Sequence, residues 1–133
     1  LELAGVPRRL MPDREWLEKL RRLSGRGSTV AVQRVLGIDA TCCESLDDVL
    51  SCLSQWGAII MKSPWSSSGK GLMLTDNPNW QGWARRILRQ QGSVVVERLL
   101  QRRQDFAMEF WMKDGRAEYM GLNLFSTAQF RPT

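Results

Sequence analysis

Residues 59–74, IIMKSPWSSSGKGLML, constrain the fold more than any other stretch of the chain. A short apolar run ends in Lys62, a loop of serines follows and ends in Gly69-Lys70-Gly71, and a second apolar run comes next. Apolar runs of this length between Ser, Gly and Pro are typical of strands, so we predict strands over 58–62 and 72–75. The two lysines then lie at opposite ends of a flexible loop that joins two strands.

Helix signals surround these strands. We predict helices over 13–23 and 45–56, and the second opens with an S-x-x-D capping signal at Ser45. A third helix is predicted to begin at Asn77-Pro78, with a capping residue followed by a proline at the first helical position, and to end before Gly92.

The remaining apolar runs complete the fold class. The run SVVVE, residues 93–97, is short and continuous and predicts a central strand. Two longer strands, over 105–112 and 117–126, flank Asp114-Gly115, a dipeptide typical of a two-residue hairpin turn. Residues 29–36 fit either a short strand or a helical turn. Because strands and helices do not alternate regularly, we predict an α+β fold with an at least partly antiparallel sheet.

Composition narrows the function. The 133 residues carry a net charge of +5, which suits an anionic partner such as a nucleotide, phosphate or nucleic acid. The sequence has no histidine, which excludes His-based triads and His metal ligands from this segment. Cys42, Cys43 and Cys52 lack the paired spacing of zinc sites, so we expect them to be packing residues in a reducing compartment. No apolar run approaches the roughly 20 residues of a membrane span and no secretory signal opens the chain, so we expect a cytoplasmic protein.

The serine loop has the composition of a phosphate-binding loop. Backbone N–H groups converge on an anion most readily where side chains are small, and nearby cations neutralise its charge. Lys70 can reach the phosphates from the loop, and Lys62 can point to the same place from the strand. A P-loop does not fit, because Pro64 stands where that motif needs Gly, Gly71 follows Lys70, and a strand comes next. A hairpin loop with exposed serines is the structural alternative for this loop taken alone.

A second signal completes a longer pattern. The pattern covers residues 58–126, about half of the chain. It begins with a strand that ends in a lysine, a flexible loop with Gly-Lys-Gly, and a second strand. A helix, a strand with Glu-x-x-Leu, an acidic residue and a long hairpin then follow. This order resembles the ATP-grasp superfamily. The resemblance implies a partial ATP-grasp-like domain over 1–133. A helical lead-in over 1–57 would precede a small α+β nucleotide-binding lobe over 58–100, and an antiparallel β-hairpin within 101–133 would start the second lobe.

The resemblance also implies a role for each matching residue. Lys62 would contact the phosphates beside the adenine, and the loop would fold over the phosphates with Lys70 at its basic position. The stretch from Glu97 would form the adenine-binding hinge, and Asp105 would hold the ribose hydroxyls. The nucleotide-binding residues that we expect are Lys62, Ser66, Ser67, Ser68, Gly69, Lys70, Gly71, Glu97, Arg98, Leu99, Leu100 and Asp105. No catalytic residue is assigned.

The sequence departs from the family pattern in three places. Trp65 and three serines stand where glycines are commoner, which indicates a stiffer and more polar loop. The family usually has an additional basic residue that contacts the phosphates earlier in the chain, and Arg26 is the candidate here. The alternative is that Arg26 is an ordinary arginine at the end of a helix. The acidic and Asn residues that bind magnesium lie in the family beyond such a hairpin, so we expect Mg²⁺ ligands beyond residue 133. Glu109 shares a strand face with Asp105 and either lines the site or takes a surface role.

The implied function is that of an ATP-dependent ligase. Such an enzyme phosphorylates a carboxylate with ATP and lets an amine or another nucleophile displace the phosphate, and we expect residues 1–133 alone to be inactive. Two alternatives stay open. A basic nucleic-acid-binding module would use the arginine pairs and the six tryptophans, whereas a noncatalytic packing domain would need only the apolar pattern.

Overall fold

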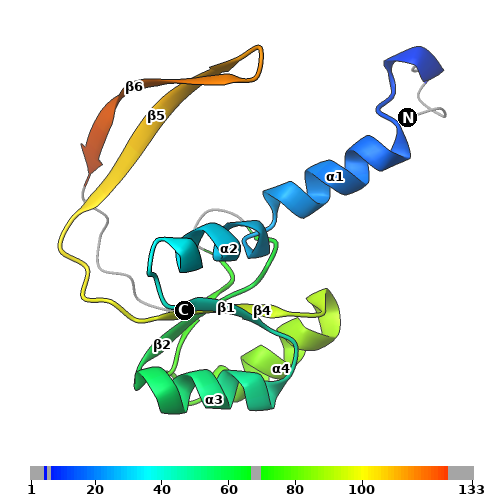
Figure 1. Cartoon of the computed structure of the whole chain (residues 1–133). Helices are drawn as coiled ribbons and strands as arrows, with labels where there is room; N and C mark the ends of the chain where they lie inside the picture. Colours follow the sequence, from blue (N-terminus) through cyan, green and yellow to red (C-terminus); the bar gives the residue numbers. More distant parts are fainter. Residues whose placement is uncertain (1–4, 6, 67–69, 126–133) are drawn as a thin grey trace. The chain divides into compact units, whose positions relative to one another are not determined.

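The computed structural model describes residues 5, 7–66 and 70–125 (Figure 1). The chain divides after Leu99 into two units, and each is described by itself. The first unit opens with a 3-10 turn at Arg8–Leu10 and contains four helices and four strands in the described residues. The helices are α1 (Arg14–Ser24), α2 (Gly27–Val35), α3 (Leu46–Trp56) and α4 (Trp80–Gln91), and the strands are β1 (Ala40–Cys43), β2 (Ile59–Lys62), β3 (Leu72–Leu74) and β4 (Val94–Arg98).

The four strands of the first unit form one antiparallel sheet in the order β1-β4-β2-β3. Helices α3 and α4 lie against one face of this sheet, and α2 lies against the other (Figure 1). The predicted α+β class with antiparallel pairing is confirmed. Edge strand β1 comes from the part of the chain before residue 58.

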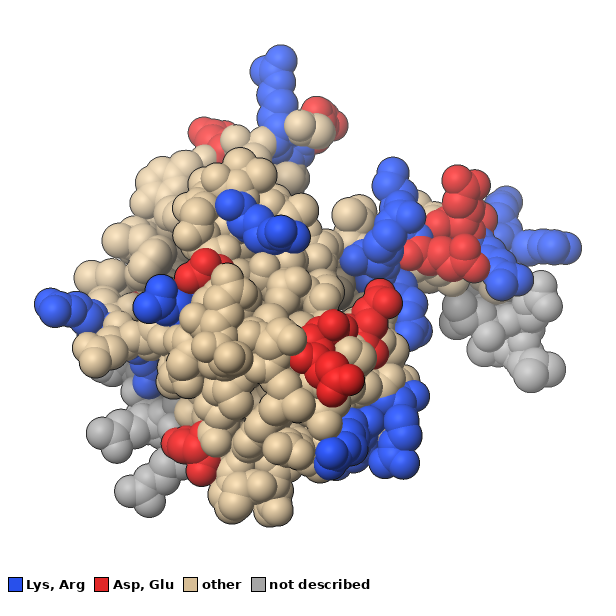
Figure 2. Space-filling model, turned by 60° about the horizontal axis from the view of Figure 1, so that its bottom comes forward, with Lys and Arg blue, Asp and Glu red and all other residues tan. Residues whose placement is uncertain are grey.

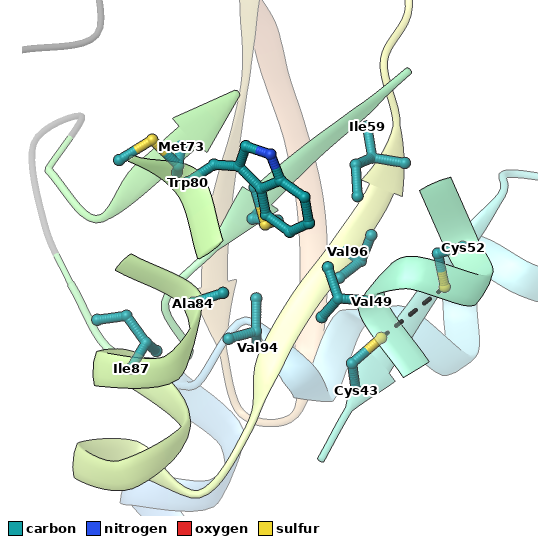
Figure 3. Close-up of a cluster of buried hydrophobic side chains, with 11 residues drawn as sticks. Cys43, Val49, Cys52, Ile59, Met73, Trp80, Ala84, Ile87, Val94 and Val96 are labelled. Carbon is teal, nitrogen blue, oxygen red and sulfur yellow. Dashed lines mark hydrogen bonds between the residues drawn. The ribbon is translucent and has the colours of Figure 1, made fainter. Parts of the chain in front are cut away.

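Strand β4 is central, as its continuous apolar run predicts. Val94 and Val96 point into the main core beneath α3 and α4, and Val95 points to the other face, where it packs with Val30 and Ala40. All three valines are at most 1% exposed. Figure 3 shows the main core, in which β2 and α4 place Ile59 and Trp80 around the two valines.

Two of the cysteines belong to this core. Cys43 and Cys52 are buried with their Sγ atoms 3.8 Å apart, across β1 and α3 (Figure 3). Burial raises the pKa of the Cys43 thiol, and the neighbouring Cys52 adds to the effect. This confirms the packing role for these two residues, whereas Cys42 is exposed.

Local sequence signals set most helix ends. Asp13 caps α1 by accepting a hydrogen bond from the Trp16 N–H at 2.6 Å. Ser45 and Asp48 form a complete capping box at the start of α3. Gly92 ends α4 in the left-handed region at φ +80°, which favours glycine.

Three sequence expectations need correction or completion. Helix α4 begins two to three residues after Asn77-Pro78, because the Asn77 side chain accepts from the Asn79 N–H at 2.9 Å and so forms a turn instead of a cap. Strand β1 is not among the predicted elements, because its four residues, Ala-Thr-Cys-Cys, form a strand only by pairing with β4. The ambiguous residues 29–36 lie mainly in helix α2.

The second unit is a hairpin of β5 (Asp105–Lys113) and β6 (Arg116–Phe125). Asp114 and Gly115 have φ of 50° and 72°, which confirms the predicted tight turn with two positive φ values. A register shift lies between Glu109 and Phe110. One face carries large apolar side chains that are each more than half exposed: Phe106, Met108, Phe110, Tyr119, Leu122 and Leu124.

A search of the described residues finds no helix with the length and apolar character needed to cross a membrane.

The first prediction concerns the core beneath β2. Ile59 is 0% exposed, so Ile59→Ala should lower the free energy of unfolding by about 2–5 kcal/mol through lost burial and a residual cavity. Val32→Ala is the control, because Val32 is 60% exposed and should change stability by no more than about 0.5 kcal/mol. Urea titration measures both. Equal effects would contradict the assignment of Ile59 to the core.

The second prediction concerns the capping box. Hydrogen bonding with Ser45, through its side chain and then its N–H, holds the pKa of Asp48 below its ordinary value of 3.8, with help from the Glu44 N–H. A carboxyl group whose pKa is lower in the folded state stabilises the fold at any pH above its unfolded-state pKa. This stabilisation is lost as the pH falls through the folded-state pKa. Asp48→Asn should therefore lower Tm at neutral pH and make no difference at a pH well below 3.8. Thermal unfolding by circular dichroism at both pH values checks it; a pH-independent difference would contradict it.

Candidate nucleotide-binding site

The candidate site lies on the face of the sheet that α2 covers. Side chains alternate along β2 and β4, so Lys62 and Glu97 point away from the main core that receives Met61 and Val96. Lys62 is opposite Val95 in the register, and Glu97 is opposite Ile60. The two charged side chains are therefore diagonal neighbours on one face, within reach of each other.

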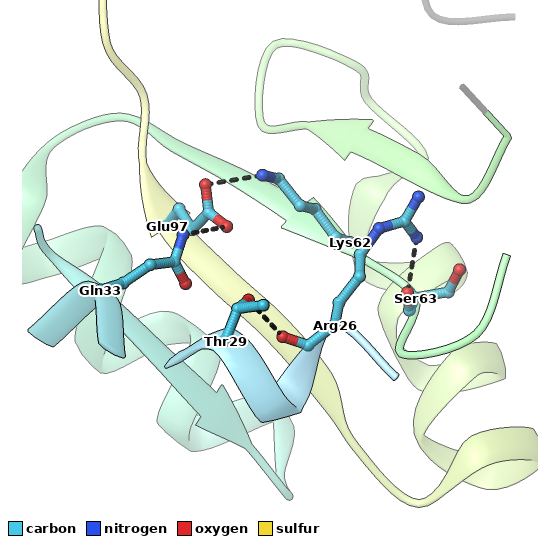
Figure 4. A network of polar contacts seen from close by, with 6 residues as sticks. All are labelled: Arg26, Thr29, Gln33, Lys62, Ser63 and Glu97. Carbon is cyan, nitrogen blue, oxygen red and sulfur yellow. Dashed lines mark hydrogen bonds and ion pairs between the residues drawn. The ribbon is translucent and has the colours of Figure 1, made fainter. Parts of the chain in front are cut away.

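Lys62 and Glu97 form an ion pair with 2.6 Å between Nζ and Oε2 (Figure 4). Their side chains are 23% and 17% exposed, so water screens the pair less than it screens a surface pair. The pair joins the predicted phosphate-contacting lysine to the first residue of the predicted hinge. An ammonium has three N–H donors, so Lys62 can donate to Glu97 and to an anion together.

Gln33 of α2 binds the other oxygen of the same carboxylate. Its Nε2 donates to Glu97 Oε1 at 3.1 Å (Figure 4). Gln33 Oε1 is buried and has no hydrogen-bond partner among the described residues. Sequence reasoning missed Gln33, because a single glutamine in a segment of uncertain structure carries no signal.

The ends of the serine loop are held together by hydrogen bonds. The Ser63 N–H donates to Gly71 O at 2.8 Å, and the Ser66 hydroxyl donates to Lys70 O at 2.6 Å. Ser66, Lys70 and Gly71 of the expected site are therefore brought together at the base of the loop. Ser67, Ser68 and Gly69 lie outside the described residues.

Arg26 ties this loop to the start of α2. Its Nη1 donates to Ser63 O at 2.7 Å (Figure 4). The same Nη1 also donates to the Ser66 hydroxyl, and the Arg26 backbone N–H donates to Pro64 O at 2.9 Å. Arg26 and Gln33 are seven residues apart, two helical turns, and so lie on one side of α2. This helix therefore contacts both the loop and the predicted hinge.

Trp65 anchors the first half of the loop. Its indole N–H donates to Arg21 O at 3.0 Å, and the Arg21 guanidinium lies 4.7 Å from the ring centroid. The Trp65 backbone N–H donates to Gln91 Oε1 at 2.9 Å. The side chain is 37% exposed, so Trp65 is a partly covered anchor at the loop base.

The other expected site residues occupy different surroundings. The Arg98 guanidinium is 3.4 Å from Asp39, and the Leu99 N–H donates to Ala58 O at 2.9 Å, which closes the end of β4. Leu100 and Asp105 belong to the second unit, where Asp105 forms an ion pair with Arg102 at 3.3 Å. Glu109 is exposed on β5.

Two hollows in the first unit lie away from the Lys62–Glu97 pair. One of about 560 Å³ lies between the end of α1 and Trp65, and one of about 420 Å³ lies beside Asp39 and Trp56. Neither is lined by Lys62, Glu97 or Lys70, so we place the site by its chemistry and not by the size of a hollow. Within the described residues, no group of three or more His, Cys, Asp or Glu could hold a metal ion.

The third prediction concerns Gly71, at φ +70°. A Cβ there would overlap Ser63 Oγ and would be 2.7 Å from Ser66 Oγ, so Gly71→Ala should lower Tm and open the loop base. Gly82→Ala is the matched control, because a Cβ at Gly82 meets nothing within 4 Å and helix α4 should gain roughly 0.5–1 kcal/mol. Thermal unfolding measures the Tm of both variants. A Gly71→Ala protein as stable as the Gly82→Ala protein would contradict the close packing of Gly71 against Ser63 and Ser66.

Two solved structures have this fold. N5-carboxyaminoimidazole synthetase from Staphylococcus aureus, complexed with ADP, matches with a TM-score of 0.62 and 15% identity over 80% of this chain and 30% of that chain. D-alanyl-alanine synthetase A from Vibrio cholerae O1 biovar eltor str. N16961 matches with a TM-score of 0.60 and 14% identity over 80% of this chain and 35% of that chain.

A scan against protein-family models found no match, and neither did a search of the curated proteins. The chain spans about a third of the length of the two matching structures. Both are ATP-grasp enzymes, so the expected resemblance is confirmed at the level of structure: this chain is similar in fold to part of an ATP-grasp enzyme.

Proposed function

We propose that this chain is the ATP-binding portion of an ATP-grasp-type ligase. The whole enzyme would form an acylphosphate on a carboxylate and couple it to an amine or another nucleophile. One observation carries the proposal. Lys62 ends the strand that leads into a Ser/Gly loop, and it pairs at 2.6 Å with Glu97 at the predicted hinge, in a fold shared with an ADP-bound synthetase.

The proposed roles follow from charge and position. Lys62 and Lys70 would neutralise the phosphates, and the backbone after Glu97 would receive the adenine. Asp105 would hold the ribose hydroxyls. In phosphoryl transfer the protein contributes mainly positioning and electrostatic stabilisation, so a cradle of two lysines and loop N–H groups is suited to the task.

Magnesium would complete the neutralisation of the phosphate charge in the whole enzyme. The residues described here do not fit a metal centre, since they contain no group of three or more acidic, His or Cys ligands. By the resemblance, the Mg²⁺ ligands would lie beyond residue 133, and no step of this chain is assigned to the metal. An enzyme of this kind would use ATP in the cytoplasm.

Two observations favour this proposal over a nucleic-acid-binding module. Trp80 is buried and Trp56 and Trp83 pack against the main core, so three of the tryptophans serve the fold. On the face shown in Figure 2, Lys and Arg side chains occur in separate groups with Asp and Glu among them. Nucleic-acid binding generally needs a basic stripe and aromatic side chains that are free to stack on bases.

The fourth prediction tests nucleotide binding by Lys62. In the full-length protein, Lys62→Ala should raise the Kd for ATP by about 10- to 150-fold, because a charge-assisted hydrogen bond contributes roughly 1.5–3 kcal/mol. Isothermal titration with ATP measures it, and circular dichroism shows whether the variant is folded. Lys19→Ala, on exposed α1, is the control and should leave the Kd unchanged.

Lys70→Ala separates loop closure from ground-state binding. Lys70 must become ordered with its loop, so its loss should change Kd less than the loss of Lys62 and turnover more. A folded Lys62→Ala protein with unchanged ATP affinity would remove the main reason for this proposal. Affinity that falls steeply with salt and follows the surface arginines would instead indicate nucleic acid.

A further inference from the structure

One carboxylate in the first unit has two partners from different elements. Glu97 of β4 receives Lys62 Nζ of β2 on Oε2 at 2.6 Å and Gln33 Nε2 of α2 on Oε1 at 3.1 Å (Figure 4). The Glu97 side chain is 17% exposed, so water has limited access to it. Each of its oxygens has a donor from the protein.

The contact between Gln33 and Glu97 has a definite orientation. An ionised carboxylate only accepts hydrogen bonds, so the amide of Gln33 must present its NH₂ group to Glu97. This orientation leaves Gln33 Oε1 buried and without a partner among the described residues. An unsatisfied buried acceptor is unfavourable, so a glutamine without a specific role at this position would turn its amide to solvent.

The geometry of the pair explains why a second donor is needed. Lys62 and Glu97 are diagonal neighbours in the sheet, because Lys62 is opposite Val95 and Glu97 is opposite Ile60. Both side chains are long and have many rotamers, so an ion pair between them alone fixes neither. Gln33 holds one oxygen of Glu97 and thereby directs the other toward the ammonium.

We propose that Gln33 is a positioning residue for Lys62. By fixing the Glu97 carboxylate, it holds the ammonium on the α2 face of β2, at the start of the serine loop. This inference rests on the proposed function only in that Lys62 meets the nucleotide phosphates there. Gln33 itself need not touch the nucleotide.

The first arm of the test uses no nucleotide. Lys62 is acetylated with limiting acetic anhydride in the full-length protein, and its modification rate is read by mass spectrometry against exposed Lys19. Glu97→Gln removes the carboxylate charge and should raise the Lys62 rate several-fold. Gln33→Leu should raise it in the same direction. Gln55→Leu, an exposed glutamine on α3, is the matched control.

The second arm measures ATP affinity. Gln33→Leu should raise the Kd by about 2- to 12-fold, the effect of one ordinary hydrogen bond. In a Glu97→Gln background the same substitution should cause little further change, because its effect passes through Glu97.

The outcomes separate this inference from the proposed function. If Glu97→Gln exposes Lys62 to acetylation and Gln33→Leu does not, the positioning role is overturned, whatever the affinity for ATP. If Gln33→Leu exposes Lys62 but the unmodified protein binds no ATP, the positioning role holds and the proposed function fails. A Gln33→Leu effect on Kd that persists in the Glu97→Gln background would also overturn the inference, because Gln33 would then act without Glu97.

Discussion

The burial of β4 on both faces is the constraint on which the first unit depends. This strand pairs with β1 on one side and β2 on the other, and its three consecutive valines send side chains alternately to two apolar clusters. Helices α3 and α4 cover one cluster, and α2 covers the smaller one. A strand that is buried on both faces must be hydrophobic at successive positions, so charged residues occur only near its ends.

Glu97 marks that end, and the candidate site is built around it. Val95 and Glu97 point to the same face, so the strand that buries α2 against the sheet also presents a carboxylate two residues later. Helix α2 makes two kinds of contact with this strand. Val30 packs on Val95, and the Gln33 amide donates a hydrogen bond to Glu97. The site is therefore a polar margin of the smaller core cluster.

The ion pair has a consequence for the proposed nucleotide binding. Lys62 is already paired with Glu97 at 2.6 Å, so under the proposed function a phosphate would have to share the ammonium with this carboxylate or displace it. Sharing is compatible with the three donors of an ammonium, and the incomplete exposure of both groups makes every added contact stronger than at the surface. Removing one member of such a pair leaves the other charge poorly solvated, which is why the fold of each variant must be checked.

Much of the architecture could be predicted from local sequence because its causes are local. The capping box at Ser45, the glycine at Gly92, the Asp114-Gly115 turn and the apolar run of β4 each act within a few residues. The order of Lys62, the serine loop and Glu97 along the chain also suggested the resemblance in fold that the two solved structures bear out. Strand β1 could not, because four residues rich in Cys become a strand only by pairing with β4.

Which polar groups meet was decided by the tertiary structure alone. Lys62 and Glu97 are 35 residues apart in the chain, and Gln33 and Glu97 are 64 apart. Their contacts depend on the antiparallel register of β2 with β4 and on the rotation of α2 over the sheet. The sequence determined which residues could bear charge near the loop. Only packing on both faces of β4 determined that a glutamine from a distant helix would hold the carboxylate that holds the lysine.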